Sequence, residues 1–184
     1  DGLPLTVKGQ LPGGRYALPG DVSSQFFTGL LFALPLAGDD SVLISTTTLE
    51  SKSYVDMTLD TLARHGITIH EKSPELYEIP GGQSYKAGAF AVEGDYSQAA
   101  FWLVSGLTGA GITLQGLFLD SKQGDKAILT ILSKMGGDIR EENGMIAAKP
   151  SKTRGTVIDA EDCPDLVPAL AALAAVSEGT TEII

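Results

Sequence analysis

The stretch Gly20-Asp21-Val22-Ser23-Ser24-Gln25-Phe26-Phe27 carries most of the information about this chain. Asp and Ser side chains accept hydrogen bonds at helix N-termini, and apolar residues follow at helical spacing, namely Phe26, Phe27, Leu30, Leu31 and Leu34. The pattern predicts a helix that begins near Ser23. Adjacent hydroxyls and unpaired backbone N–H groups at such a start can bind an anion, although an ordinary N-cap over a buried helix has the same pattern.

The same stretch recurs roughly 70 residues later, which indicates an internal repeat. Residues 94–101 repeat residues 20–27, and residues 119–122 and 128–136 repeat residues 49–52 and 58–66. Each copy predicts the order strand, helix, strand, helix, strand, strand. A third copy begins at Thr156 and stops after one strand, one helix and the start of a second strand.

The repeat assigns most elements of the chain. Helices are expected to start near Ser23, Ser53, Ser97, Asp125 and Asp165, the last one running over Leu166–Val176. Strands are expected at Leu3–Gln10, Tyr16–Leu18, Ile67–Ile69, Phe90–Val92, Asp138–Arg140, Thr156–Asp159 and Thr180–Ile184. Because a repeat cannot bury its faces alone, we expect a segment of a longer protein cut at both ends. The alternative is a small complete domain with a degenerate final repeat.

Composition favours a globular protein and excludes several classes of partner. Of 184 residues, 43% are hydrophobic and 20% charged, and no apolar run reaches the roughly 18 residues of a membrane span. The net charge of −10 argues against nucleic acid and anionic membranes, although backbone N–H groups can still bind a small anion. The single Cys163 excludes an internal disulfide and favours a reducing, cytoplasmic location.

Common motifs for metals and nucleotides are absent from the sequence. His65 and His70 belong to no cluster with metal-ligand spacing, and Cys163 has no His near it in sequence. Neither a Walker loop nor a Rossmann glycine fingerprint occurs, and Gly81-Gly82 after Ile79-Pro80 predicts a turn. We therefore expect no metal and no cofactor.

Taken in order, six short motifs resemble the central part of the 5-enolpyruvylshikimate-3-phosphate synthase family. They occur in the family's order with similar spacing and cover nearly the whole chain. They are Gly20–Phe26, Ser51–Thr58, Gly81–Tyr85, Val92–Ala99, Gln123–Asp125, and Pro164-Asp165 before an Ala-rich helix.

The resemblance implies an α/β fold of βαβαββ units, arranged as the inside-out α/β barrel of the enolpyruvyl transferases. About two and a half units would be present here. Residues 1–88 would form the last unit of one lobe, and residues 89–184 the first one and a half units of the other. The chain would cross between lobes near residues 81–93.

The resemblance also implies an activity and a substrate site. The family transfers the enolpyruvyl group of phosphoenolpyruvate to the 5-hydroxyl of shikimate-3-phosphate, in aromatic amino acid biosynthesis. Ser23, Ser24 and Ser51 would hold the 3-phosphate of shikimate-3-phosphate. Gln25 would contact both shikimate-3-phosphate and phosphoenolpyruvate, and Tyr54 would lie near the shikimate carboxylate.

Asp165 is the expected catalytic residue. By the resemblance, it would bind the shikimate hydroxyls and accept the proton of the attacking 5-hydroxyl. A carboxylate within hydrogen-bond reach of that hydroxyl is a suitable base, although Asp165 alone could equally be a helix cap after Pro164. The family's phosphoenolpyruvate-binding cations lie outside this sequence, so we expect the segment alone to be inactive. We expect the parent enzyme to be a monomer.

Two other functions remain open at this point. One is the related transferase that acts on UDP-N-acetylglucosamine, which relies on a different, cysteine-containing loop. The other is a non-catalytic repeat module used as a scaffold. The hydroxyl pair Ser23-Ser24 favours the shikimate enzyme over the first, and together with Asp165 it also disfavours the scaffold, which needs neither feature.

Overall fold

A computed structural model describes residues 3–184. The chain divides into two compact units, Asp1–Gly88 and Ala89–Ile184, each with a hydrophobic core of its own. Both units mix helices and strands, which confirms the α/β class. The assignment of the two units to separate lobes of a larger protein, with a hinge near residues 81–93, stays a prediction. No helix within residues 3–184 has the length and apolar composition needed to cross a membrane.

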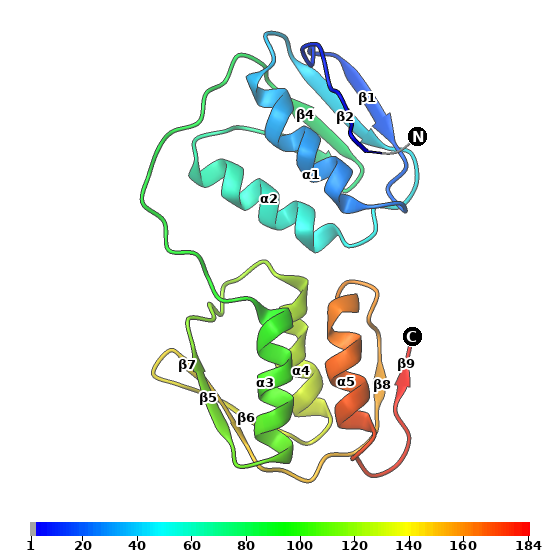
Figure 1. Ribbon diagram of the computed structural model, residues 1–184, viewed down its shortest axis with the longest axis vertical. Helices are drawn as coiled ribbons and strands as arrows, with labels where there is room; N and C mark the ends of the chain where they lie inside the picture. Colours follow the sequence, from blue (N-terminus) through cyan, green and yellow to red (C-terminus); the bar gives the residue numbers. More distant parts are fainter. Residues whose placement is uncertain (1–2) are drawn as a thin grey trace. The chain divides into compact units, whose positions relative to one another are not determined.

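The first unit contains one complete repeat in the predicted βαβαββ order. Its elements are β1 (Arg15–Leu18), α1 (Ser24–Ala33), the 3₁₀ turn η1 (Leu34–Leu36), β2 (Ser41–Ser45), α2 (Lys52–Arg64), β3 (His70–Ser73) and β4 (Leu76–Ile79). The sheet order is β1-β2-β4-β3, with β1 parallel to β2 and the other pairs antiparallel. Helices α1 and α2 pack together over one face of this sheet (Figure 1).

The core of the first unit lies between the sheet and its two helices. Leu43 of β2 is fully buried and belongs to the same cluster as Phe27 and Leu31, which are four residues apart on α1. Val55 and Leu62 of α2, which lie on the same face of that helix, belong to this cluster as well. Side chains at these spacings lie on one side of a helix, so both helices are fixed against the sheet.

The second unit begins with helix α3 (Tyr96–Thr108). Its further elements are β5 (Ile112–Gln115), the 3₁₀ turn η2 (Gly124–Lys126), α4 (Ala127–Lys134), β6 (Asp138–Glu142), β7 (Met145–Lys149), β8 (Val157–Ile158), the 3₁₀ turn η3 (Pro164–Leu166), α5 (Val167–Ala174) and β9 (Glu182–Ile183). Strands β5, β7 and β6 form one antiparallel sheet in that order, and β8 pairs with β9 in parallel. Helix α3 packs against both α4 and α5 (Figure 1).

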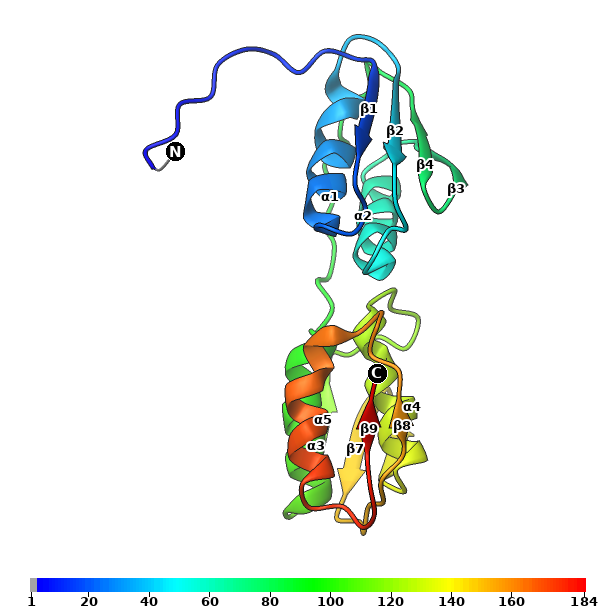
Figure 2. The same ribbon diagram turned by 90° about the vertical axis from the view of Figure 1, so that its right-hand side faces the viewer.

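The five predicted helix starts are confirmed to within about two residues. Two predicted strands are wrong. Residues 3–10 join no sheet, and Figure 2 shows them running away from β1. Their apolar side chains Leu3, Leu5 and Val7 are 91%, 76% and 85% exposed. A strand needs a neighbour to accept its hydrogen bonds, and none of the described residues provides one here.

The second wrong strand is Phe90–Val92, which is extended without being paired in a sheet. Val92 is 95% exposed, and β5 pairs only with β7. In the first unit the corresponding place is taken by β1 beside β2. The strand predicted at Ile67–Ile69 is displaced, because the observed strand β3 begins three residues later, at His70, and includes none of these residues.

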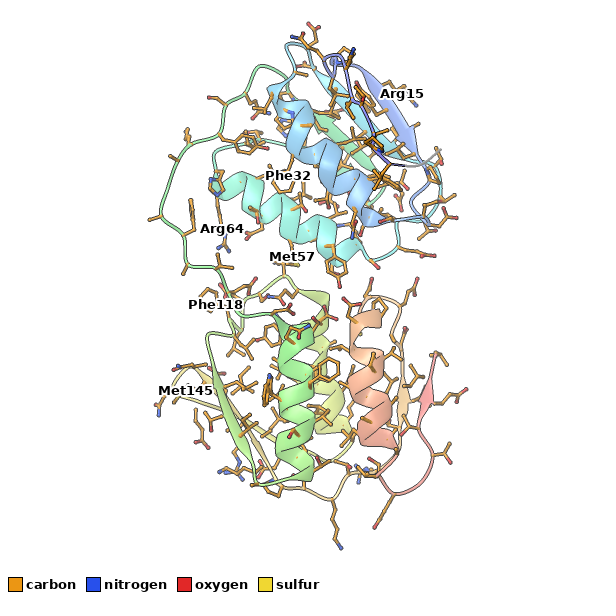
Figure 3. The ribbon with its side chains drawn as sticks, viewed as in Figure 1. Arg15, Phe32, Met57, Arg64, Phe118 and Met145 are labelled. Atoms are coloured by element: carbon orange, nitrogen blue, oxygen red, sulfur yellow. The ribbon has the colours of Figure 1, made fainter. Side chains whose placement is uncertain are left out.

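The segment after β4 is fastened to the first unit. The Gln83 side chain donates to the Thr68 carbonyl at 2.9 Å and accepts from the Thr68 N–H at 2.7 Å. The Tyr85 hydroxyl donates to the carbonyl of Phe32, labelled near the end of α1 in Figure 3, at 2.6 Å. The N–H of Lys86 donates to the carbonyl of His65, the residue after α2, at 2.8 Å. The chain therefore stays attached to this unit as far as Lys86.

Candidate substrate-binding site

Five of the six predicted site residues gather at one edge of the sheet in the first unit. Ser23 lies on the connection from β1 to α1 and Ser51 on the connection from β2 to α2, while Ser24, Gln25 and Tyr54 lie in the first turns of these helices. Because β1 and β2 are parallel neighbours, both helices start at the carboxyl ends of the strands. This is the edge at which α/β proteins commonly bind ligands.

Hydrogen bonds hold the two connections together. The N–H of Thr46 donates to the carbonyl of Leu18 at 2.9 Å, and the N–H of Glu50 donates to the carbonyl of Gly20 at 3.2 Å. The Thr47 hydroxyl accepts from the N–H of Gly20 at 2.8 Å. The starts of α1 and α2 are therefore parts of one joined structure.

Gly20 is required by the closeness of this approach. A Cβ at this position would lie 2.2 Å from the Oγ of Ser45 and 2.7 Å from the carbonyl oxygen of Thr48. Both distances are far below van der Waals contact, and the second partner is backbone that cannot rotate away. Any side chain here would push the two connections apart.

Helix α1 begins with a neutral cap. The Ser23 Oγ accepts from the N–H of Gln25 at 3.3 Å, and the backbone of Ser23 is extended. The first turn contains no acidic residue. Ser23 and Ser24 are half-buried and Gln25 is exposed. The start of α1 thus offers hydroxyls and the positive end of a helix dipole, with a neutral cap and no acidic residue in the first turn.

Helix α2 begins at a strained residue. Ser51 has φ 52° and ψ 43°, the left-handed conformation that non-glycine residues rarely adopt, and its side chain caps no N–H of the helix. Its carbonyl accepts from the N–H of the half-buried Tyr54 at 3.1 Å. Non-glycine residues in sparsely populated conformations cluster at active sites and ligand clamps.

The nearest cation along α2 is already neutralised. Lys52 follows Ser51 and forms ion pairs with Asp56 and, at 3.0 Å, with Glu71. Burial lowers the pKa of Lys52, but hydrogen bonds to the two carboxylates outweigh it, so the pKa lies above its ordinary value. An anion at this edge would therefore be held chiefly by hydroxyls and N–H groups.

The corresponding helix of the second repeat is capped differently. The Oδ1 of Asp95 accepts from the N–H of Ser97 at 2.8 Å, from its hydroxyl at 2.7 Å and from the N–H of Gln98 at 3.2 Å. Burial raises the pKa of Asp95, but these hydrogen bonds outweigh it and leave the pKa below its ordinary value. The sequence repeat pairs Asp95 with Asp21, whereas the structure pairs it with Ser23 as the N-cap.

Asp165 lies in the second unit, apart from the other predicted site residues in the chain. It is exposed on η3, between Pro164 and the start of α5. The geometry within this unit is that of a turn leading into a helix, and its catalytic role stays a prediction. Among residues 3–184, no group of three or more His, Cys, Asp or Glu side chains could hold a metal ion.

The sequence analysis missed the contribution of Thr47. Its hydroxyl bonds to the β1–α1 connection, although it lies on the β2–α2 connection. The signal was present as three consecutive threonines, Thr46 to Thr48, directly after a buried strand. Hydroxyls at the carboxyl end of a parallel strand are candidates for ligand or loop contacts.

Comparison with known proteins identifies the family. A family model described as EPSP synthase (3-phosphoshikimate 1-carboxyvinyltransferase) matches residues 1–184. The chain belongs to the EPSP synthase family. A 3-phosphoshikimate 1-carboxyvinyltransferase of Clostridium kluyveri is 57% identical over 99% of this chain, and one of Clostridium acetobutylicum is 51% identical over 99%.

Solved structures of related proteins have the same fold. EPSP synthase from Acinetobacter baumannii matches with a TM-score of 0.74 and 25% identity over 95% of this chain and 40% of its own. The enolpyruvyl transferase NikO from Streptomyces tendae matches with a TM-score of 0.67 and 18% identity, covering 95% of this chain and 44% of its own, and shows the fold alone. The chain spans 43% of the Clostridium kluyveri relative and 42% of the Clostridium acetobutylicum one.

Proposed function

We propose that this chain supplies the shikimate-3-phosphate side of a 3-phosphoshikimate 1-carboxyvinyltransferase. The observation that carries the proposal is the joined pair of helix starts. Ser23 and Ser24 lie at the start of α1, and Ser51 lies at the start of α2, at the same edge of the sheet. A phosphate needs several donors at once. Hydroxyls and backbone N–H groups at two neighbouring helix N-termini supply them together with two favourable helix dipoles.

The remaining residues of this edge fit a cyclic polyol acid bearing that phosphate. Gln25 is exposed in the first turn of α1, where its amide can donate to one substrate and accept from another. Tyr54 lies in the first turn of α2, where its hydroxyl can donate to the shikimate carboxylate. We assign Gln25 to contacts with both shikimate-3-phosphate and phosphoenolpyruvate.

The proposed reaction is an addition followed by an elimination. The 5-hydroxyl oxygen of shikimate-3-phosphate bonds to the enol carbon of phosphoenolpyruvate while its proton passes to Asp165, and an acid outside this chain protonates the methylene carbon. The tetrahedral adduct then loses a methyl proton and inorganic phosphate, which restores the double bond in the product. Asp165 acts as the general base of the first step.

Two features disfavour the other candidate functions. A transferase acting on UDP-N-acetylglucosamine relies on a different, cysteine-containing loop, whereas the single Cys163 is 3% exposed and burial raises its pKa. A scaffold module has no use for the left-handed Ser51 beside a tightly packed Gly20. The single cysteine favours a reducing compartment such as the cytoplasm, and we propose a monomer there.

Titration of the 184-residue chain with shikimate-3-phosphate tests this proposal. We expect binding that shikimate, which lacks the phosphate, reproduces only weakly. Replacing Ser23 and Ser24 with Ala together should raise the dissociation constant by about one to three decades, at roughly 1–2 kcal/mol for each hydroxyl. Ser105→Ala on the exposed face of α3 is the control and should change nothing. Equal affinity of the double variant and the unaltered chain would refute the site.

A further inference from the structure

Thr47 joins the two connections through one side-chain atom. Its Oγ1 accepts from the N–H of Gly20 at 2.8 Å and from the N–H of Asp21 at 3.2 Å. Thr47 is itself held, because its carbonyl accepts from the buried Ser45 hydroxyl at 2.7 Å. One hydroxyl on the β2–α2 connection thus satisfies two successive donors on the β1–α1 connection.

We propose that Thr47 is a positioning residue of the phosphate site. It fixes Gly20 and Asp21, and with them the start of α1, relative to the start of α2 at Ser51. Thr47 need not touch the substrate to do this. The inference rests on the proposed function, because it concerns how the donors of that same site are kept in register.

Loss of the Thr47 hydroxyl should affect both folding and binding. Thr47 is exposed, so the loss leaves no cavity in the core. The N–H of the exposed Asp21 can then bond to water, whereas the N–H of the buried Gly20 loses its acceptor, which lowers the stability of the fold. The fixed distance between the two sets of phosphate donors is lost as well, and small misplacements of such groups weaken their joint action strongly. Affinity measured on the folded chain therefore separates positioning from stability.

The alternative is that Thr47 only stabilises the fold of the connection. Under that alternative, a variant without the hydroxyl would melt at a lower temperature and bind the substrate as before once folded. Gly20 opposes this alternative, since its missing side chain lets the two connections approach closely at the same point. The close approach at Gly20 and the shared Thr47 hydroxyl together fix the positions of the two helix starts relative to each other.

The test compares Thr47→Val, which removes the hydroxyl, with Thr47→Ser, which keeps it. Thr46→Val is a matched control on the same connection. Each chain is titrated with shikimate-3-phosphate by calorimetry and melted without ligand. Thr47→Val should melt at a lower temperature and, measured well below that temperature, should bind about tenfold more weakly, a difference of about 1.4 kcal/mol in binding free energy. Thr47→Ser and Thr46→Val should bind like the unaltered chain. Amide exchange at Gly20 and Asp21 should be faster in Thr47→Val alone.

Each result supports or overturns the inference. Equal affinity of Thr47→Val and the unaltered chain overturns the role of Thr47 and leaves the proposed function standing. Absence of binding by the unaltered chain overturns the proposed function, and the positioning role with it. If Thr47→Val does not fold, Thr47→Ala takes its place, and failure of both to fold makes Thr47 a stability residue and overturns the inference.

Discussion

Ser23 and Asp95 occupy the same position at the starts of α1 and α3, but only Asp95 brings a negative charge. In α3 the carboxylate itself takes the hydrogen bonds of two N–H groups and one hydroxyl. In α1 the neutral Ser23 accepts a single long bond of 3.3 Å. The start of α3 thus supplies its own anion, Asp95, whereas the start of α1 is suited to binding an anion from a ligand.

Ser23→Asp should convert the start of α1 into that of α3. The fold should keep its stability or gain up to about 1 kcal/mol, because Asp caps as well as Ser and its charge favours the helix dipole. Affinity for shikimate-3-phosphate should fall by at least tenfold, since two like charges would compete for one site. Calorimetry and thermal melting check both parts, with Ser105→Asp as the charge-matched control. Unchanged affinity would show that the phosphate does not bind at this helix.

Asp95→Ala should destabilise the second unit by about 1 kcal/mol through loss of the cap. The folded pKa of Asp95 is lowered, so the contribution of its charge is present above the unfolded pKa of about 3.9 and is lost as the pH falls through the lower folded value. Urea unfolding at pH 7 and pH 3 tests this. The gap between the unaltered chain and Asp95→Ala should shrink at pH 3. A gap independent of pH would exclude a role for the charge.

Ser51→Gly and Ser51→Ala should separate backbone strain from the hydroxyl. Gly relieves a left-handed residue of about 1–2 kcal/mol but adds chain entropy of up to about 1 kcal/mol, so Ser51→Gly should be as stable as the unaltered chain or slightly more so. Ser51→Ala keeps the strain. Both variants lose the hydroxyl and should bind shikimate-3-phosphate about tenfold more weakly. Urea unfolding and calorimetry measure the two effects. Full affinity in either variant would remove Ser51 from the site.

Asp165→Asn should lower turnover far more than substrate binding, when placed in an enzyme of the full length of the relatives. Loss of a positioned base costs on the order of 10²–10⁴ in rate. The Asn side chain keeps the size and an acceptor, so the dissociation constant for shikimate-3-phosphate should change little. Steady-state kinetics and calorimetry give the two numbers. Turnover near that of the unaltered enzyme would leave Asp165 as a residue of the turn before α5 without a catalytic role.

Local patterns in the sequence predicted the helices well. The starts of α1 and α3 follow Gly-Asp pairs, with a serine cap in α1, an aspartate cap in α3 and apolar residues at helical spacing, which are properties of neighbouring residues. The six candidate site residues were named from the family resemblance that the short motifs carry. The structure places five of them at one sheet edge, a fact that follows from the parallel pairing of β1 with β2.

The errors concern features that depend on distant residues. Leu3–Gln10 and Phe90–Val92 have strand composition, but a strand forms only where another edge is free to pair with it. The repeat alignment also mispaired Asp21 with Asp95, because helix α1 starts four residues after its glycine and α3 only two. Nothing local distinguishes the left-handed Ser51 from an ordinary serine.

The two hydrophobic cores, which share no residue, have a consequence for how this chain unfolds. Cooperative melting requires that breaking one contact weakens the rest, and the buried side chains of each cluster pack against other members of the same cluster. Denaturation of the chain should therefore proceed in two steps, and one midpoint does not define one free energy. A ligand bound beside Ser23 should shift the step of the first unit and leave the other in place.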